Sequence, residues 1–175
     1  MLKAVKIFLV LLFLTLVLLF SLLFSGIKID SFSLGNLNVS QFYIKLNKKL
    51  IVEIEQIDYK SRKSKENKGS FESLKQSLEL FPNIVKYFET IYIERLNLKD
   101  NEFTIFLDDN SLYLDSKYLN LSSKLDFQGS RVILDMYSLY LKDIELMLDG
   151  KISVDYFEEK LNYYGEYFYH DLQGE

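Results

Sequence analysis

Few residues of this chain are of the types that carry out catalysis or hold metals. The sequence has no cysteine and a single histidine, His170. A thiolate or imidazole metal centre, or a nucleophile activated by histidine, therefore lacks the residues to form it. Asp108 and Asp109 could be read as a carboxylate pair. However, neighbouring residues of a hairpin point to opposite sides, and aspartate is common in turns. We expect no enzyme activity, no cofactor and no metal site.

Basic side chains with one acid among them fill residues 60–70, KSRKSKENKGS. Lysine and arginine at a membrane surface attract anionic headgroups, at about 1 kcal/mol each. Short charged segments are also common as solvated loops, and this second interpretation is favoured. The possible headgroup contacts are Lys60, Arg62, Lys63, Lys65 and Lys68.

The overall composition is that of a strand-rich chain. Its 175 residues include 14 Phe and 13 Tyr, but only one Pro and 7 Gly. Aromatic and β-branched residues are enriched in strands. The net charge of −4 does not suggest a nucleic-acid-binding protein, which usually has a basic face or stripe.

Residues 7–24, IFLVLLFLTLVLLFSLLF, form a long apolar run. About 18 residues is roughly what a helix needs to cross the hydrocarbon core of a bilayer. A cleaved signal peptide usually has a shorter apolar region followed by small residues at the cleavage site. Lys3 and Lys6 precede the run, which predicts a cytoplasmic N-terminus. We expect a cytoplasmic tip and an uncleaved signal-anchor over residues 1–25, with a β-rich domain over residues 26–175 on the far side of the membrane. In a Gram-negative cell the membrane is the inner membrane and that side is the periplasm.

After Gly26 the chain reads as short alternating strands separated by turns, which predicts an antiparallel meander. Gly35-Asn36 and Asp149-Gly150 are typical turn dipeptides, and the latter is the strongest signal for a two-residue hairpin.

Residues 71–89 change period, with apolar residues three and four apart, from Phe71 to Phe88. This pattern predicts one amphipathic helix, with a kink or a new start at Pro82. Its polar positions carry mixed charges, which favours packing on the sheet over lying on a membrane.

Several later strands have one apolar face, which must pack on a second sheet, lie under the helix or line an apolar trough. Ordinary packing is the commoner outcome. These faces consist of Leu119, Leu121, Leu125 and Phe127; Val132, Leu134 and Met136; Ile144, Leu146 and Leu148; and Ile152 and Val154.

The order of an anchor, GIKIDSFSLGNLNVSQFYIKL, KKLIVEIEQIDY, a basic loop, a helix and IYIERLNLKDNEFTIFLDDNSLYLDSKYLNL resembles the N-terminal part of AsmA-like bacterial envelope proteins, in particular the YhdP-type branch. The resemblance implies a membrane helix that leads into a curled β-groove or open half-barrel. It further implies phospholipid transport between the inner and outer membranes, as in bridge-like lipid transfer proteins. The apolar faces above, together with Phe103, Ile105 and Leu107, would then contact acyl chains.

The chain is much shorter than such proteins, so the resemblance implies a truncated member or a short relative, with a C-terminal edge strand free to pair with another β-groove protein. Two other functions fit an anchored β-protein of this length. One is the small anchored jelly-roll subunit of the lipopolysaccharide export bridge. The other is an envelope scaffold or assembly factor that carries no lipid.

Overall fold

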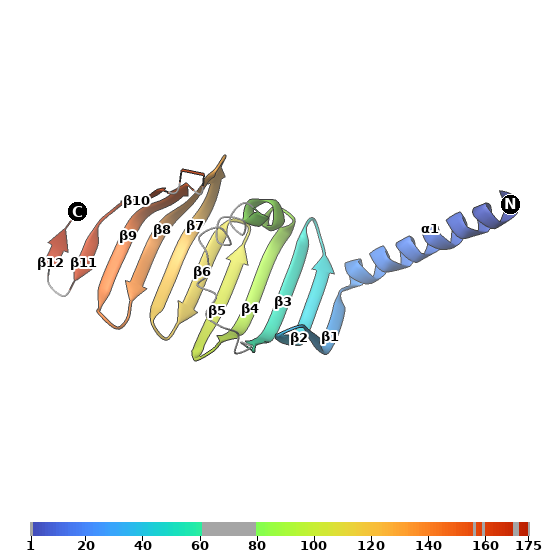
Figure 1. Cartoon of the computed structure of the whole chain (residues 1–175), viewed down its shortest axis with the longest axis horizontal. Coiled ribbons are helices and arrows are strands. Elements are labelled where there is room, and N and C mark those ends of the chain that lie inside the picture. Colours follow the sequence, from blue (N-terminus) through green and yellow to red (C-terminus); the bar gives the residue numbers. More distant parts are fainter. Residues whose placement is uncertain (1, 61–79, 156, 159, 170–171, 175) are drawn as a thin grey trace.

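The computed structural model joins one long helix to a single open β-sheet, and it describes residues 2–60, 80–155, 157–158, 160–169 and 172–174 (Figure 1). The helix α1 (Leu2–Ser25) contains the apolar run, and its segment Val5–Ser25 is long and apolar enough to cross a membrane. No part of the apolar window in that segment is buried inside the described structure. The Thr15 hydroxyl donates a hydrogen bond to the Leu11 carbonyl oxygen at 2.8 Å. This bond satisfies a polar group in an otherwise apolar helix.

The described strands form one sheet and follow one another in chain order from β1 to β9. Next to β9 lie β10 and β11, and β12 pairs with β11. The prediction of a mainly β protein with one N-terminal apolar helix is therefore confirmed. The strands are β1 (Ile27–Leu34), β2 (Leu37–Leu46), β3 (Leu50–Tyr59), β4 (Phe88–Leu98), β5 (Asn101–Asp108), β6 (Ser111–Ser116), β7 (Leu119–Gln128), β8 (Arg131–Leu141), β9 (Leu146–Asp155), β10 (Lys160–Tyr164), β11 (Tyr167–Tyr169) and β12 (Leu172–Gly174).

The prediction of an antiparallel meander is wrong at one pairing, because β3 and β4 run parallel. Their connection spans residues 60–87 and returns the chain to the end of the sheet at which β3 begins. The other described strand pairs are antiparallel. Parallel neighbours need a long crossover of this kind, usually with a helix. The segment with the helix-like spacing of apolar residues therefore belongs to the crossover between two parallel strands.

Helical structure in this crossover is described for residues 80–85, and the predicted residues 71–79 lie outside the described residues. The prediction of a helix to residue 89 is wrong at its end, because Phe88 and Glu89 belong to β4. Val85 is buried against Leu107, Leu125 and Val132. The described end of the helix thus packs on the sheet, as the favoured interpretation predicts for this part of its apolar face.

The predicted hairpin at Asp149-Gly150 is wrong, because both residues lie inside β9. Gly150 has a φ of 110°, and a Cβ there would clash with the Tyr164 carbonyl oxygen and the Gly165 Cα. Glycine at residue 150 therefore lets the backbone of β9 lie close to the backbone that connects β10 to β11. The Gly35-Asn36 turn between β1 and β2 is confirmed.

β1 to β4 share one break in their alternation. The pairing skips one residue in each strand, and the skipped residues form a row across the sheet: Asp30, Gln41, Glu55 and Glu94. In each strand the apolar residues are spaced two, three and two apart: Ile27, Ile29, Phe32, Leu34; Leu37, Val39, Phe42, Ile44; Val52, Ile54, Ile57, Tyr59; Ile91, Ile93, Leu96, Leu98.

This shared break returns the apolar residues to one face. Phe42 pairs with Ile29, so strict alternation would place Phe32 on the other face. Instead the Phe32 and Phe42 rings meet edge to face, with centroids 5.6 Å apart. Gln41 has a φ of 50°, which is a conformation typical of an irregular strand position. Where β4 meets β5, the register shifts between Ile93 and Leu96. The break shared by β1 to β4 therefore does not continue into β5.

Candidate functional site

One face of the sheet carries a continuous row of apolar residues, which we call the apolar row. Each member is the direct pairing partner of the next, so the row crosses the sheet from β1 to β11 by way of each successive strand up to β9. Its members are all half-buried or exposed in the described structure. They are Ile29, Phe42, Ile54, Ile93, Ile105, Leu114, Leu121, Leu139, Leu148 and Tyr167.

The residues beside the apolar row are more deeply covered. Leu107, Leu125, Val132 and Met136 are each no more than 6 % exposed. Three of them form the core cluster with Val85 of the crossover helix, and the Phe81 ring contacts the Phe127 ring at 6.0 Å between centroids. The crossover helix therefore covers one side of the apolar face and turns part of it into ordinary core.

The residues predicted to contact acyl chains divide between these two environments. Ile105, Leu121 and Leu148 lie in the apolar row. Ile144 lies in the turn before β9 and is 51 % exposed, so its assignment to a strand face is wrong. The pairing places the remaining predicted residues on the same face beside the row: Phe103, Leu107, Leu119, Leu125, Phe127, Val132, Leu134, Met136, Leu146, Ile152 and Val154.

The sequence prediction missed the part of the row that lies nearest the helix α1. It also missed Leu114, Leu139 and Tyr167, which lie farther along the row. In the first four strands, Ile29, Phe42, Ile54 and Ile93 were not among the expected contacts. Strict alternation hides them, because each strand from β1 to β4 changes parity at the shared break. The two-three-two spacing of apolar residues is the signal that would have revealed them.

The opposite face of the sheet carries charged side chains, and some of them form ion pairs. The Lys142 Nζ lies 2.8 Å from the Asp115 carboxylate, and this hydrogen bond holds the pKa of Asp115 below its usual value. Lys151 and Asp135, which are direct partners across β8 and β9, form an ion pair at 3.4 Å. The sheet therefore separates an apolar face from a hydrated one.

The basic segment predicted to touch headgroups lies mostly outside the described residues. Lys60 is described and exposed. Arg62, Lys63, Lys65 and Lys68 lie in the range 61–79, which the structure does not describe. The proposed headgroup contacts thus stay a prediction.

The adjacent carboxylates Asp108 and Asp109 have structural partners. The Thr90 hydroxyl donates a hydrogen bond to Asp108 at 3.2 Å, and Lys49 forms an ion pair with Asp109 at 3.3 Å. Among the described residues, no group of three or more histidine, cysteine or acidic residues could hold a metal ion. Asp108 and Asp109 therefore connect strand ends at one margin of the sheet.

Comparison of this chain with family models, with curated proteins and with solved structures gave no match.

Proposed function

We propose that this protein is an inner-membrane-anchored lipid-binding protein that takes part in phospholipid transport between the two membranes of a bacterial envelope. The helix α1 holds it in the inner membrane, with the N-terminus in the cytoplasm and the sheet in the periplasm. Acyl chains lie along the apolar row, and the curvature of the sheet forms a shallow groove around them. The continuity of the apolar row from β1 to β11 is the observation that carries this proposal.

The arrangement of the helix and sheet supports the proposal. The helix and the stack of strands follow one another along the long axis of the molecule, with β1 next to the helix and β12 farthest away (Figure 1). A helix that crosses a bilayer therefore leaves β1 nearest the membrane, and the apolar row leads away from it. Adjacent strands are about 4.8 Å apart, so each step adds that length to the path.

The half-buried state of the row also supports the proposal. A stable soluble protein rarely leaves a long contiguous apolar strip open to water unless the strip binds something. Here the crossover helix covers Leu107 and Leu125, but the apolar row beside them stays partly accessible among the described residues.

The export-bridge alternative fits the described strands less well. A jelly roll has two packed sheets, whereas the described strands form one sheet with neighbours mostly in chain order. A lipid-free scaffold would use the same helix and sheet, so the distinguishing property is bound lipid.

A crosslinking experiment tests the proposal directly. A photoreactive amino acid replaces Leu139 of the apolar row in one variant and Tyr140, its neighbour on the opposite face, in the other. Illumination in intact cells, followed by mass spectrometry of the purified full chain, should show phospholipid adducts at residue 139 and few at residue 140. Protein purified in mild detergent should also carry phospholipid at a stoichiometric level.

Two results would contradict the proposal. Equal labelling at both positions indicates general contact with membrane or detergent. A purified protein without phospholipid indicates a scaffold.

A further inference from the structure

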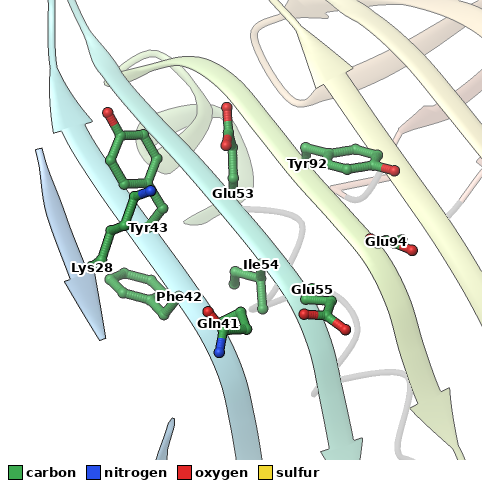
Figure 2. Close-up of a pocket in the computed structure, with 9 residues that line it drawn as sticks. All are labelled: Lys28, Gln41, Phe42, Tyr43, Glu53, Ile54, Glu55, Tyr92 and Glu94. Carbon is green, nitrogen blue, oxygen red and sulfur yellow. The ribbon is translucent and has the colours of Figure 1, made fainter. Parts of the chain in front are cut away.

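A hollow of about 580 Å³ lies on β1 to β4, next to the end of the helix α1 (Figure 2). Phe42 and Ile54 of the apolar row also line it, but most of its side chains are charged or aromatic, which sets its chemistry apart from that of the row. The lining side chains that matter here are Lys28, Tyr43, Glu53, Tyr92 and Glu94.

Four of these residues form a single register row across the sheet. Lys28 pairs with Tyr43, Tyr43 with Glu53, and Glu53 with Tyr92. Side chains of direct partners have Cβ atoms about 5 Å apart, so the Glu53 carboxylate lies between two tyrosine rings (Figure 2). The Lys28 Nζ lies 5.8 Å from the centroid of the Tyr43 ring, at one end of the row.

The hollow has an excess of negative charge. Glu55 is paired with Arg95 at 2.7 Å. Glu53 and Glu94 form no ion pair with any described residue. The described acidic residues form no group able to hold a metal ion. A carboxylate between aromatic rings instead suits an organic ammonium ion, which both the charge and the ring faces attract.

The hollow also lies at the level of the membrane surface if α1 is in the bilayer. Gly26 ends the helix, and its amide hydrogen-bonds to the Leu22 carbonyl oxygen at 2.9 Å. Tyr43 lies against Gly26, and Lys28 comes two residues after Gly26 in the sequence. Tyrosine and lysine in such places typically lie among lipid headgroups.

We propose that this hollow binds a zwitterionic phospholipid headgroup. The ammonium group lies at Glu53 between the rings of Tyr43 and Tyr92, and the Lys28 ammonium pairs with the phosphate. An anionic headgroup without an amine is disfavoured, because Glu53 and Glu94 repel it. The inference rests on the membrane anchoring in the proposed function but not on the binding of acyl chains by the apolar row.

The test uses the full chain in detergent micelles with a soluble probe, phosphoethanolamine, and inorganic phosphate as the control ligand. Nuclear magnetic resonance of ¹³C-labelled tyrosine rings reports binding, and Tyr43→Phe and Tyr92→Phe assign the two signals. We expect phosphoethanolamine, and not phosphate, to shift both signals. Glu53→Gln should weaken binding about fivefold, and Tyr92→Leu about threefold. Glu102→Gln, an exposed acid of β5 outside the hollow, should leave the affinity unchanged.

A second measurement establishes whether the ligand is a lipid. The protein is placed in nanodiscs with equal amounts of phosphatidylethanolamine and phosphatidylglycerol, and native mass spectrometry then counts retained lipids. We expect enrichment of phosphatidylethanolamine that Glu53→Gln removes and Glu102→Gln keeps.

Three results would overturn the inference. Wild-type affinity in Glu53→Gln would show that the carboxylate is not the binding group, and equal shifts with phosphate would show an adventitious ion only. Binding of phosphoethanolamine without lipid enrichment would assign the hollow to a free phosphoamine. Crosslinking at Leu139 is independent of all three results, so a failure of the proposed lipid path is recognised separately.

Discussion

The ring of Tyr43 lies so close to Gly26 that a Cβ at residue 26 would come within 2.6 Å of its hydroxyl oxygen. Gly26 has a φ of 89°, and it is the single residue between the helix α1 and β1. The helix therefore ends and the sheet begins at a position that only glycine occupies without strain. Tyr43 of β2 fixes this junction from the side.

Replacement of Gly26 by alanine should destabilise the protein strongly. The left-handed backbone costs about 1–2 kcal/mol for a residue with a Cβ, and the contact with Tyr43 adds to that cost. We expect the Tm in detergent to fall by several degrees, as measured by circular dichroism. Gly35→Ala is the matched control, because its φ is 62° but nothing lies within 4 Å of the new methyl group. Equal losses in both variants would show that the Tyr43 contact has no effect.

The irregular position at Gln41 should tolerate glycine and reject a β-branched residue. Its φ of 50° is unfavourable for side chains branched at Cβ. We expect Gln41→Val to lower the free energy of unfolding by about 1–2 kcal/mol and Gln41→Gly to leave it nearly unchanged. Lys45→Val in the same strand should cost little, since valine favours strands. Denaturant titration of the three variants measures the differences. A Gln41→Val protein as stable as Lys45→Val would contradict the expected strain.

Val85 should contribute more to stability than its neighbour Ile84. Val85 is 3 % exposed and packs on Leu107, Leu125 and Val132, whereas Ile84 is 50 % exposed. Removal of two buried methyl groups costs about 2 kcal/mol, including the cavity that they leave. We expect Val85→Ala to lower the free energy of unfolding by that amount and Ile84→Ala to change it by less than about 0.5 kcal/mol. A larger effect at Ile84 would mean that the opposite side of the helix is the covered one.

Asp155 should make the protein sensitive to acid. Its carboxylate accepts hydrogen bonds from the Glu158 amide at 3.0 Å and from Arg131 Nε at 3.0 Å, and these lower its pKa from 3.8 to about 2. A pKa lowered by folding adds stability above the unfolded value, and that stability is lost as the pH falls through the folded value. The contribution should therefore disappear between about pH 4 and pH 2.

The variant Asp155→Asn separates this group from the other carboxylates. We expect it to be less stable than the wild type at pH 6 and to lose less stability between pH 4 and pH 2, as measured by thermal unfolding. Asp126→Asn, at an exposed carboxylate of β7, should follow the wild-type profile. An Asp155→Asn profile parallel to that of the wild type would exclude Asp155 as the source of acid sensitivity.

The sequence predicted the elements better than their connections. The apolar run, the Gly35-Asn36 turn and the alternation of β7 and β8 are local patterns, and each predicted its element. The parallel pairing of β3 and β4 depends on where the crossover returns the chain, which no local pattern contains. The hairpin at Asp149-Gly150 was predicted wrongly, because the same dipeptide occurs in turns and at strand positions where another backbone segment lies close to the glycine.

The candidate site was predicted in part for the same reason. Leu121 and Leu148 could be assigned to a face by counting along their own strands. Ile54 and Ile93 could not, because the break in β3 and β4 changes the parity of the residues that follow. The pairing of neighbouring strands was needed to show that these residues continue one row.

Only Gly26 connects the helix α1 to β1, and this short connection has a mechanical consequence. A transmembrane helix commonly tilts by about 20° from the bilayer normal. With β1 joined directly to the helix, such a tilt rotates the whole stack of strands with it. The far end of the apolar row lies about 43 Å from β1 at a spacing of about 4.8 Å per strand, so the tilt moves that end sideways by roughly 15 Å. The helix and sheet then act as a lever, and the thickness of the membrane helps to set the direction in which the row points.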